Sequence, residues 1–365
     1  MNKHDVNQRI ADRSDCFYWQ TDRKISTEET RTIWQDRHSA ISNKDLLEKI
    51  NSLLVEESLD TIYPIDPNAQ TSLGNINSVR VGRLSNGKEV IIRCHPRGIK
   101  NGYFHVESLA AKLATTHNLP SYSTYLIHDL ENEDDISFQM IEKLDGKTAV
   151  FYLKEDPDSE NRIVYEMGKT LAKINSIKVN GFGPFDNEKA KNGELVGTHS
   201  SQKEAVLAGL YENIDRLVTY SVIDENMAKK MRNLFETTSL FDNITPSLVH
   251  NDFVDWNVIT NGTAITGILD WDECVGGCPE EEIACWSTFF TPQRLENFLN
   301  GYFSVVEKPD NFEDKLNIFK LRYVISKMAL RVKRLAYDNS DFLKTLIENG
   351  KIHLNNLIKI FELDK

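Results

Sequence analysis

Apolar and polar residues follow two different patterns along the chain. Between residues 58 and 145, short apolar runs alternate with polar positions, and two of them, Ser78–Leu84 and Glu89–Cys94, flank an Asn-Gly pair. An Asn-Gly pair between alternating segments is typical of a two-residue hairpin turn. Beyond residue 146 the apolar residues recur mostly at helical spacing, as in Asp158–Ser176. The pattern therefore predicts an α+β chain in which a β-rich part precedes a mostly helical part.

The same pattern divides the chain into three expected segments. Residues 1–57 are predicted to be a helical extension, because the apolar residues between 46 and 54 fall on one helical face. Residues 58–145 are predicted to form a β-rich lobe with one helix, Glu107–Thr116, and residues 146–365 an α-rich lobe. In the α-rich lobe we expect one helix each at 158–176, 279–290, 292–306, 311–337 and 342–361, two helices within 201–238, and a Gly-Pro-rich turn at Gly181–Phe185.

One stretch of the helical part, Leu248–Trp271, has the pattern of strand, loop, strand, turn and strand. Its polar exceptions are Asp252, Asn257 and Asp270, and Asn-Gly again marks the turn. Carboxylate and amide oxygens are magnesium ligands, and a carboxylate can accept the proton of a substrate hydroxyl. The stretch therefore indicates a phosphoryl-transfer site. The alternative is that these three residues only serve turns, where Asp and Asn are favoured.

The spacing of these residues resembles a known family. His250-x-Asp252-x-x-x-x-Asn257, followed by Ile268–Trp271, resembles the catalytic loop and metal-binding segment of aminoglycoside phosphotransferases and their small-molecule kinase relatives. Protein kinases have Arg where Asn251 stands, and Phe-Gly after the metal-binding Asp. The resemblance implies a bilobal protein-kinase-like fold with a small antiparallel N-lobe and a large α-helical C-lobe. It also implies transfer of the γ-phosphate of ATP, or GTP, to an alcohol group.

The resemblance implies a role for each motif residue. Asp252 is expected to be the catalytic base or orienter of the acceptor hydroxyl, and Asn257 and Asp270 are expected to hold Mg²⁺. His250 is placed in the catalytic loop, with support through hydrogen bonds favoured over a chemical step. The Gly181–Phe185 string is similar to hygromycin B phosphotransferase-type sequences, although Asn175 stands where relatives usually place a His.

The β-rich lobe carries the expected nucleotide contacts. Arg93 ends an apolar run, and a cation there requires a partner, for which Glu107 is the natural candidate. The resemblance puts Arg93 where kinases have a phosphate-binding Lys, and the alternative is a purely structural ion pair. The remaining expected nucleotide contacts are of two kinds. A small-residue loop over the phosphates contributes Ser72, Gly74, Asn75 and Ser78, and the segment between the lobes contributes Glu142.

Acidic residues after the metal-binding aspartate bear on the acceptor. Asp272 and Glu273 are expected substrate contacts, and with Glu280–Glu282 they favour a cationic, amino-sugar-like acceptor. The alternative is an acidic helix start that complements the helix dipole. Glu282 is assigned to support of the catalytic loop, and Cys278 replaces a common Asp of the relatives. Three functions stay open: an aminoglycoside phosphotransferase, a metabolic kinase for choline, fructosamine, methylthio-sugar or homoserine, and a non-catalytic pseudokinase.

Composition restricts the class of protein further. The formal net charge of −12 argues against a nucleic-acid partner, whose phosphates require a basic face. We find no signal-peptide pattern and no run approaching 18 apolar residues, so we expect a cytoplasmic protein without membrane spans, as monomer or homodimer. Five cysteines without an export signal indicate reduced thiols, and the spacing of Cys274, Cys278 and Cys285 is not that of a zinc site.

Overall fold

The computed structural model describes residues 42–65, 77–95, 103–132, 134–335 and 339–364, and their contacts divide the chain into two compact units. The first unit comprises the described residues up to Ser108 together with Tyr122–Leu144. The second comprises Leu109–Ser121 and the described residues from Asp145 onward. Residues 109–121, which the sequence pattern places in the β-rich lobe, thus group with the helical unit.

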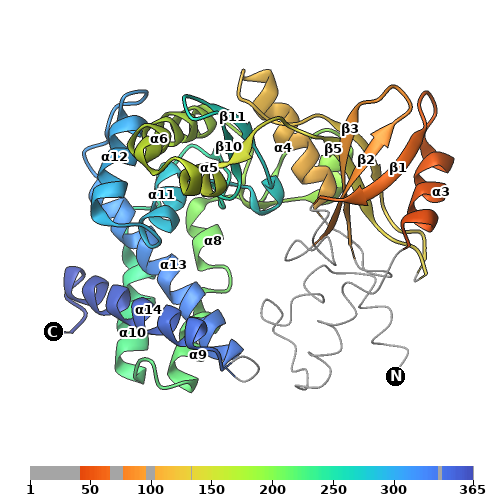
Figure 1. Ribbon diagram of the computed structural model, residues 1–365. Coiled ribbons are helices and arrows are strands. Elements are labelled where there is room, and N and C mark those ends of the chain that lie inside the picture. Colours follow the sequence, from red (N-terminus) through yellow and green to blue (C-terminus); the bar gives the residue numbers. More distant parts are fainter. Residues whose placement is uncertain (1–41, 66–76, 96–102, 133, 336–338, 365) are drawn as a thin grey trace. The chain divides into compact units, whose positions relative to one another are not determined.

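Five antiparallel strands, in the order β1-β2-β3-β5-β4, build the first unit (Figure 1). The predicted hairpin is confirmed at its predicted bounds, and Gly87 at its turn has φ 84°, a value that favours glycine. The strands are β1 (Leu59–Pro64), β2 (Ser78–Leu84), β3 (Glu89–Cys94), β4 (Thr124–His128) and β5 (Phe138–Glu142).

Helix α3 (Asn43–Leu53) covers this sheet. Its N-cap is Ser42, whose hydroxyl accepts a hydrogen bond from the Asp45 backbone N–H at 3.0 Å. Leu46 and Ile50 are fully buried among strand residues such as Ile92, and each such side chain stabilises the fold by about 1.5–3 kcal/mol. α3 is the described part of the predicted N-terminal extension; residues 1–41 lie outside the described residues.

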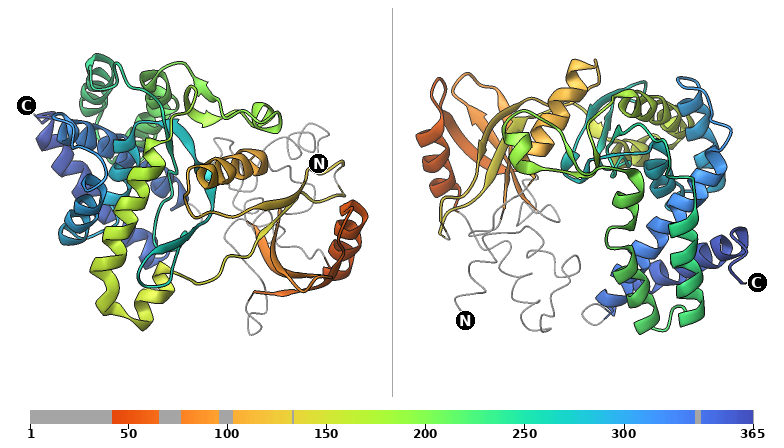
Figure 2. Two further views of the ribbon diagram at one scale, coloured as in Figure 1. Left: turned by 90° about the horizontal axis from the view of Figure 1, so that it is seen from above. Right: turned by 180° about the vertical axis from the view of Figure 1, so that it is seen from behind.

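Helices dominate the second unit (Figure 2). The backbones of α6 and α12 lie close together at two glycines. A Cβ at Gly168 or Gly301 would lie only 2.0 Å from a carbonyl oxygen of the other helix. The predicted two helices within 201–238 are three, since Gly209, at φ 65°, separates α8 from α9. The helices are α5 (Ala149–Glu155), α6 (Glu160–Ser176), α7 (Asn187–Lys191), α8 (Gln202–Leu207), α9 (Leu210–Thr219), α10 (Glu225–Thr237), α11 (Pro279–Ser287), α12 (Pro292–Phe303), α13 (Phe312–Arg334) and α14 (Asp341–Ile360).

Helix α4 (Phe104–Thr116) begins three residues before the predicted start at Glu107 and runs from the first unit into residues assigned to the second. Within the described residues, no helix has the length and apolar character needed to cross a membrane.

Two small sheets in the second unit hold the predicted catalytic stretch. One has the order β11-β10-β6 and the other β8-β7-β12-β9. The predicted turn at Gly181–Phe185 is wrong for its last four residues, which form strand β7 and pair with β12 and β8. Gly181 allows this pairing, because a Cβ there would lie 2.7 Å from the Gly197 carbonyl oxygen. The strands are β6 (Lys147–Thr148), β7 (Phe182–Phe185), β8 (Gly197–His199), β9 (Ser247–Val249), β10 (Val258–Thr260), β11 (Ile265–Ile268) and β12 (Val275–Gly277).

Candidate active site

Strands β9, β10 and β11 confirm the predicted strand, loop, strand, turn and strand. Asn251 leaves β9 at φ 66°, and Asp270 follows β11 at φ 62° and ψ 59°, so both lie in the left-handed region. That region costs an L-residue roughly 1–2 kcal/mol, although Asn and Asp adopt it more readily than most. The Leu269 N–H donates to the Asn257 carbonyl at 2.8 Å. This bond ties the segment that carries Asp270 to the loop that carries Asn257.

Asp252 and Asn257 contact each other directly. The Asn257 side-chain Nδ2 donates to the Asp252 carboxylate at 2.7 Å and to the Asp252 carbonyl oxygen at 2.9 Å. Because both bonds use the amide nitrogen, the amide oxygen Oδ1 is the atom of Asn257 that remains to accept or to bind a cation.

Burial, and then the nearby negative charge of Asp270, raise the pKa of Asp252 from 3.8 to about 6. Hydrogen bonds from Trp256 and Asn257 and the charge of Lys327 act in the opposite direction. A carboxylate whose pKa is raised by burial and by a neighbouring carboxylate is typical of a site that a cation or a proton has to complete.

The residues present fit a hard divalent cation. Asn257 offers an amide oxygen and Asp270 a half-buried carboxylate, and Mg²⁺ prefers such oxygen ligands, in small number, together with substrate phosphates. The negative charge shared by Asp252 and Asp270 would be offset by such a cation.

His250 is fully buried and hydrogen-bonded on both ring nitrogens. Nε2 lies 2.9 Å from the Leu269 carbonyl oxygen, to which it donates, and Nδ1 accepts from the Asp252 backbone N–H at 3.3 Å. Burial lowers the pKa of His250 from 6.5 to about 4, so the imidazole is neutral at pH 7. This geometry is consistent with the supporting role preferred for His250 from sequence.

Glu282 ties the catalytic loop to α11. Its carboxylate oxygens accept the backbone N–H groups of His250 at 2.8 Å and of Phe253 at 2.9 Å, so it holds the backbone on both sides of Asp252. Burial raises the pKa of Glu282 from 4.5 to about 7. These contacts agree with the loop-supporting role assigned to Glu282.

The loop has two further supports, Arg294 and Asn175, of which sequence reasoning missed the first. Arg294 on α12 binds both carboxylate oxygens of Asp255, at 2.6 and 2.7 Å, and both side chains are largely buried. Asn175 at the end of α6 donates to the Leu248 carbonyl at 3.0 Å and accepts from the Tyr302 hydroxyl at 3.1 Å. Asn175, which stands where relatives usually place a His, therefore supports the loop through its side-chain amide.

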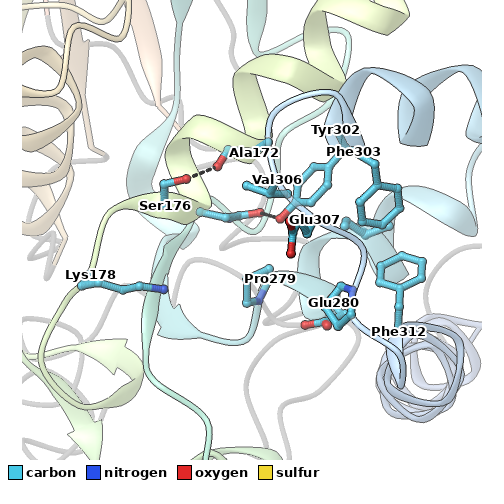
Figure 3. A pocket seen from close by; sticks show the side chains of 13 residues that line it. Ala172, Ser176, Lys178, Pro279, Glu280, Tyr302, Phe303, Val306, Glu307 and Phe312 are labelled. Atoms are coloured by element: carbon cyan, nitrogen blue, oxygen red, sulfur yellow. Dashed lines mark hydrogen bonds between the residues drawn. The ribbon is translucent and has the colours of Figure 1, made fainter.

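The acidic residues that follow Asp270 differ from one another in burial and in contacts. Glu280, which accepts a hydrogen bond from the Cys278 thiol at 2.7 Å, lines a cavity of about 200 Å³ with Tyr302 and Phe312 (Figure 3). Asp272 is 8% exposed, whereas Glu273 is exposed. Glu280–Glu282 do lie in the first turn of α11, as the alternative of an acidic helix start expects, but Glu280 and Glu282 are buried and not solvated.

In the first unit, Arg93 and Glu107 form the predicted ion pair, and both are buried. The Tyr122 hydroxyl also donates to Glu107, at 2.5 Å. Glu142 ends β5, where its carboxylate accepts the Ser123 N–H at 3.2 Å and lies 3.6 Å from the Lys88 ammonium. Ser78 begins β2; Ser72, Gly74 and Asn75 lie outside the described residues.

A profile of the "Phosphotransferase enzyme family" matches residues 74–313, which is more than half of the chain and includes Arg93, Glu107 and the catalytic stretch Leu248–Trp271. The chain belongs to this phosphotransferase family. The predicted family resemblance is thereby confirmed, and a comparison with curated protein sequences gives no match.

Solved structures show which fold this phosphotransferase has. Aminoglycoside phosphotransferase APH(4)-Ia matches with a TM-score of 0.60 and 15% identity, over 87% of this chain and 97% of that one. A thermostable mutant of it, in ternary complex with AMP-PNP and hygromycin B, matches with a TM-score of 0.60 and 17% identity, over 88% and 98%. A putative fructosamine-3-kinase from Thermobifida fusca matches with 0.58 and 14%, over 86% and 100%. At these identities the likeness confirms the predicted α+β, protein-kinase-like fold.

Proposed function

We propose that this phosphotransferase uses a magnesium-bound nucleoside triphosphate, ATP or GTP, to phosphorylate a hydroxyl group of a small molecule. The observation that carries the proposal is the contact of Asp252 with Asn257, beside the left-handed Asp270. An acid with a raised pKa, an amide with its oxygen available and a second acid form the set that phosphoryl transfer to an alcohol requires.

The catalytic step follows from the properties of Asp252. Its carboxylate orients the acceptor hydroxyl and accepts the hydroxyl proton while the new O–P bond forms. The bond between the γ-phosphorus and the bridging oxygen breaks, which releases the nucleoside diphosphate. Magnesium held by Asn257 and Asp270 supplies positive charge for the phosphate oxygens.

The remaining residues position these groups. His250, Glu282 and the Asp255–Arg294 pair hold the loop, because all bond to its backbone or side chains inside the protein. In the first unit, Arg93, oriented by Glu107, is proposed to bind nucleotide phosphates, and the strand end at Glu142 to lie near the nucleotide base.

Two classes of acceptor have support. The fold likeness to an aminoglycoside phosphotransferase solved with hygromycin B supports an amino-sugar antibiotic bound by Asp272 and Glu273. The likeness to a putative fructosamine-3-kinase supports a metabolic hydroxyl compound. The third possibility, a pseudokinase, is disfavoured because Asp252, Asn257 and Asp270 are all retained. We place the enzyme in the cytoplasm, as a monomer or homodimer.

A coupled ADP-release assay tests the proposal. The acceptors to screen are aminoglycosides, choline, fructosamines and homoserine, each with Mg-ATP and with Mg-GTP. We expect acceptor-dependent ADP release that Asp252→Asn abolishes. Binding of Mg-AMP-PNP without turnover on any acceptor would instead indicate a pseudokinase.

A further inference from the structure

Side chains from three segments form a ring of contacts beside Asp252, to which Trp256 bonds and on which the charge of Lys327 acts. Trp256 of the catalytic loop meets Phe289, just beyond α11, edge to face at 6.5 Å between ring centroids. Phe289 meets Tyr323 of α13 at 6.3 Å between ring centroids, and the Lys327 ammonium lies 5.3 Å from the centroid of the Tyr323 ring.

 Lys327 therefore lies over the Tyr323 ring. Trp256 is 48% exposed and Phe289 44% exposed, so two aromatic faces next to the catalytic aspartate are open to a ligand.

The charged groups of this ring are cations. Lys327 and Arg331 are one turn apart on α13, and Tyr323 is one turn before Lys327, so the three side chains share one helical face. Lys327 is close enough to the loop for its charge to lower the pKa of both Asp252 and the buried Cys285 thiol. Among the described residues, neither Lys327 nor Arg331 forms an ion pair; Arg331 donates to the Leu346 carbonyl at 3.2 Å.

Half-buried cations that form no ion pair within the part of the chain that the structure describes favour an anion. Burial lowers the pKa of Arg331, which shows that its charge is held partly out of water. His353 on α14 adds to this environment, since burial and then the charges of Lys320 and Arg331 lower its pKa. An anionic group placed here would gain charge-assisted hydrogen bonds from these cations.

We propose that the acceptor is an anionic hydroxyl compound with an apolar or aromatic face. Its hydroxyl lies at Asp252, its anionic group at Lys327 and Arg331, and its flat face against Trp256 and Phe289. The inference rests on the proposed function and, of its two classes of acceptor, selects the metabolic hydroxyl compound, in a form that carries a carboxylate or a similar anion.

Two probes that differ only at C6 of the sugar, a carboxylate in one and a hydroxymethyl group in the other, test this inference. Phenyl β-D-glucuronide and phenyl β-D-glucoside share the aromatic ring and the ring hydroxyls, and only the former has a carboxylate. We expect the glucuronide to bind about tenfold more tightly in calorimetric titrations, with and without Mg-AMP-PNP. Lys327→Gln should reduce its affinity to that of the glucoside, and Lys327→Arg should retain the preference. Lys315→Gln, elsewhere on α13, is the matched control and should leave both affinities unchanged.

The other outcomes distinguish a failure of this inference from a failure of the proposed function. Equal binding of the two probes, no binding of either, or a preference that survives Lys327→Gln would overturn the inference. Weaker Mg-AMP-PNP binding in Lys327→Gln would also overturn it, since the anion held there would then be a nucleotide phosphate. A wild-type protein that prefers the glucuronide but does not bind Mg-AMP-PNP would contradict the proposed function and leave the anion site standing.

Discussion

Replacement of Glu282 by Ala removes the main tie between α11 and the catalytic loop. Two buried backbone N–H groups, of His250 and Phe253, would lose their acceptors. An unsatisfied buried donor costs about 1–3 kcal/mol, so we expect the free energy of unfolding to fall by about 2–6 kcal/mol. Misplacement of Asp252 between the two released groups should lower kcat by up to about 100-fold.

The Glu282→Gln variant tests the pH dependence of the same contact. Burial raises the pKa of Glu282 from 4.5 to about 7, so between these values the folded protein holds the proton that the unfolded chain has released. The contribution of Glu282 to stability is therefore complete below pH 4.5 and is lost as the pH rises towards 7, by roughly 3 kcal/mol. Glu282→Gln lacks this term, so the stability difference between wild type and variant should shrink over that window.

Urea unfolding at several pH values, together with kcat, measures both effects. Burial raises the pKa of Glu281 as well, so the pH dependence is compared between the wild type and Glu282→Gln. Glu281→Gln is the control for kcat, because it removes a carboxylate one residue away that interacts with Gln202, at 3.3 Å, and with the Arg322 charge, and not with the catalytic loop. It should cost less than about 1.5 kcal/mol and leave kcat unchanged. If Glu282→Ala kept the stability and kcat of the wild type, the assignment of Glu282 as the tie of the loop would be refuted.

Three further changes test individual contacts. Asp252→Asn should lower transfer by about 10²–10⁴-fold, because the variant cannot accept the proton, and should leave Mg-AMP-PNP binding intact; retained turnover would refute the base assignment. Arg93→Met leaves Glu107 buried without its cation and should cost about 3–5 kcal/mol in urea unfolding, whereas an unchanged midpoint would contradict the buried pair. Arg294→Met should likewise destabilise through Asp255 and lower kcat more than it raises KM; a pure KM effect would assign Arg294 to binding.

Local patterns predicted the parts of this protein that depend on short segments. The β2–β3 hairpin has the predicted bounds because an Asn-Gly turn and the alternation of apolar residues act within a few residues of each other. The spacing of Asp252 and Asn257 likewise indicated a site, since the hydrogen bond between them spans only five residues.

Contacts between distant segments could not be predicted in this way. Strand β7 contains two glycines and a proline, which indicate a turn when read locally, and only its pairing with β12 makes it a strand. Asp255 and Arg294 are 39 residues apart in the chain. Lys327 is farther still from Asp252, and their proximity depends on how α13 packs against α11. Burial cannot be seen in a sequence either, so Asp272 and Glu273 look alike there although the first is buried and the second is exposed.

The magnesium dependence of nucleotide binding tests the central claim most directly. AMP-PNP should be titrated calorimetrically into the wild type, Asn257→Ala and Asp270→Ala, with and without Mg²⁺. If these side chains hold the metal of a phosphotransferase site, the wild type will bind AMP-PNP more tightly with Mg²⁺, and both variants will lose most of that gain while remaining folded. A gain from Mg²⁺ that is the same in all three proteins would contradict the account.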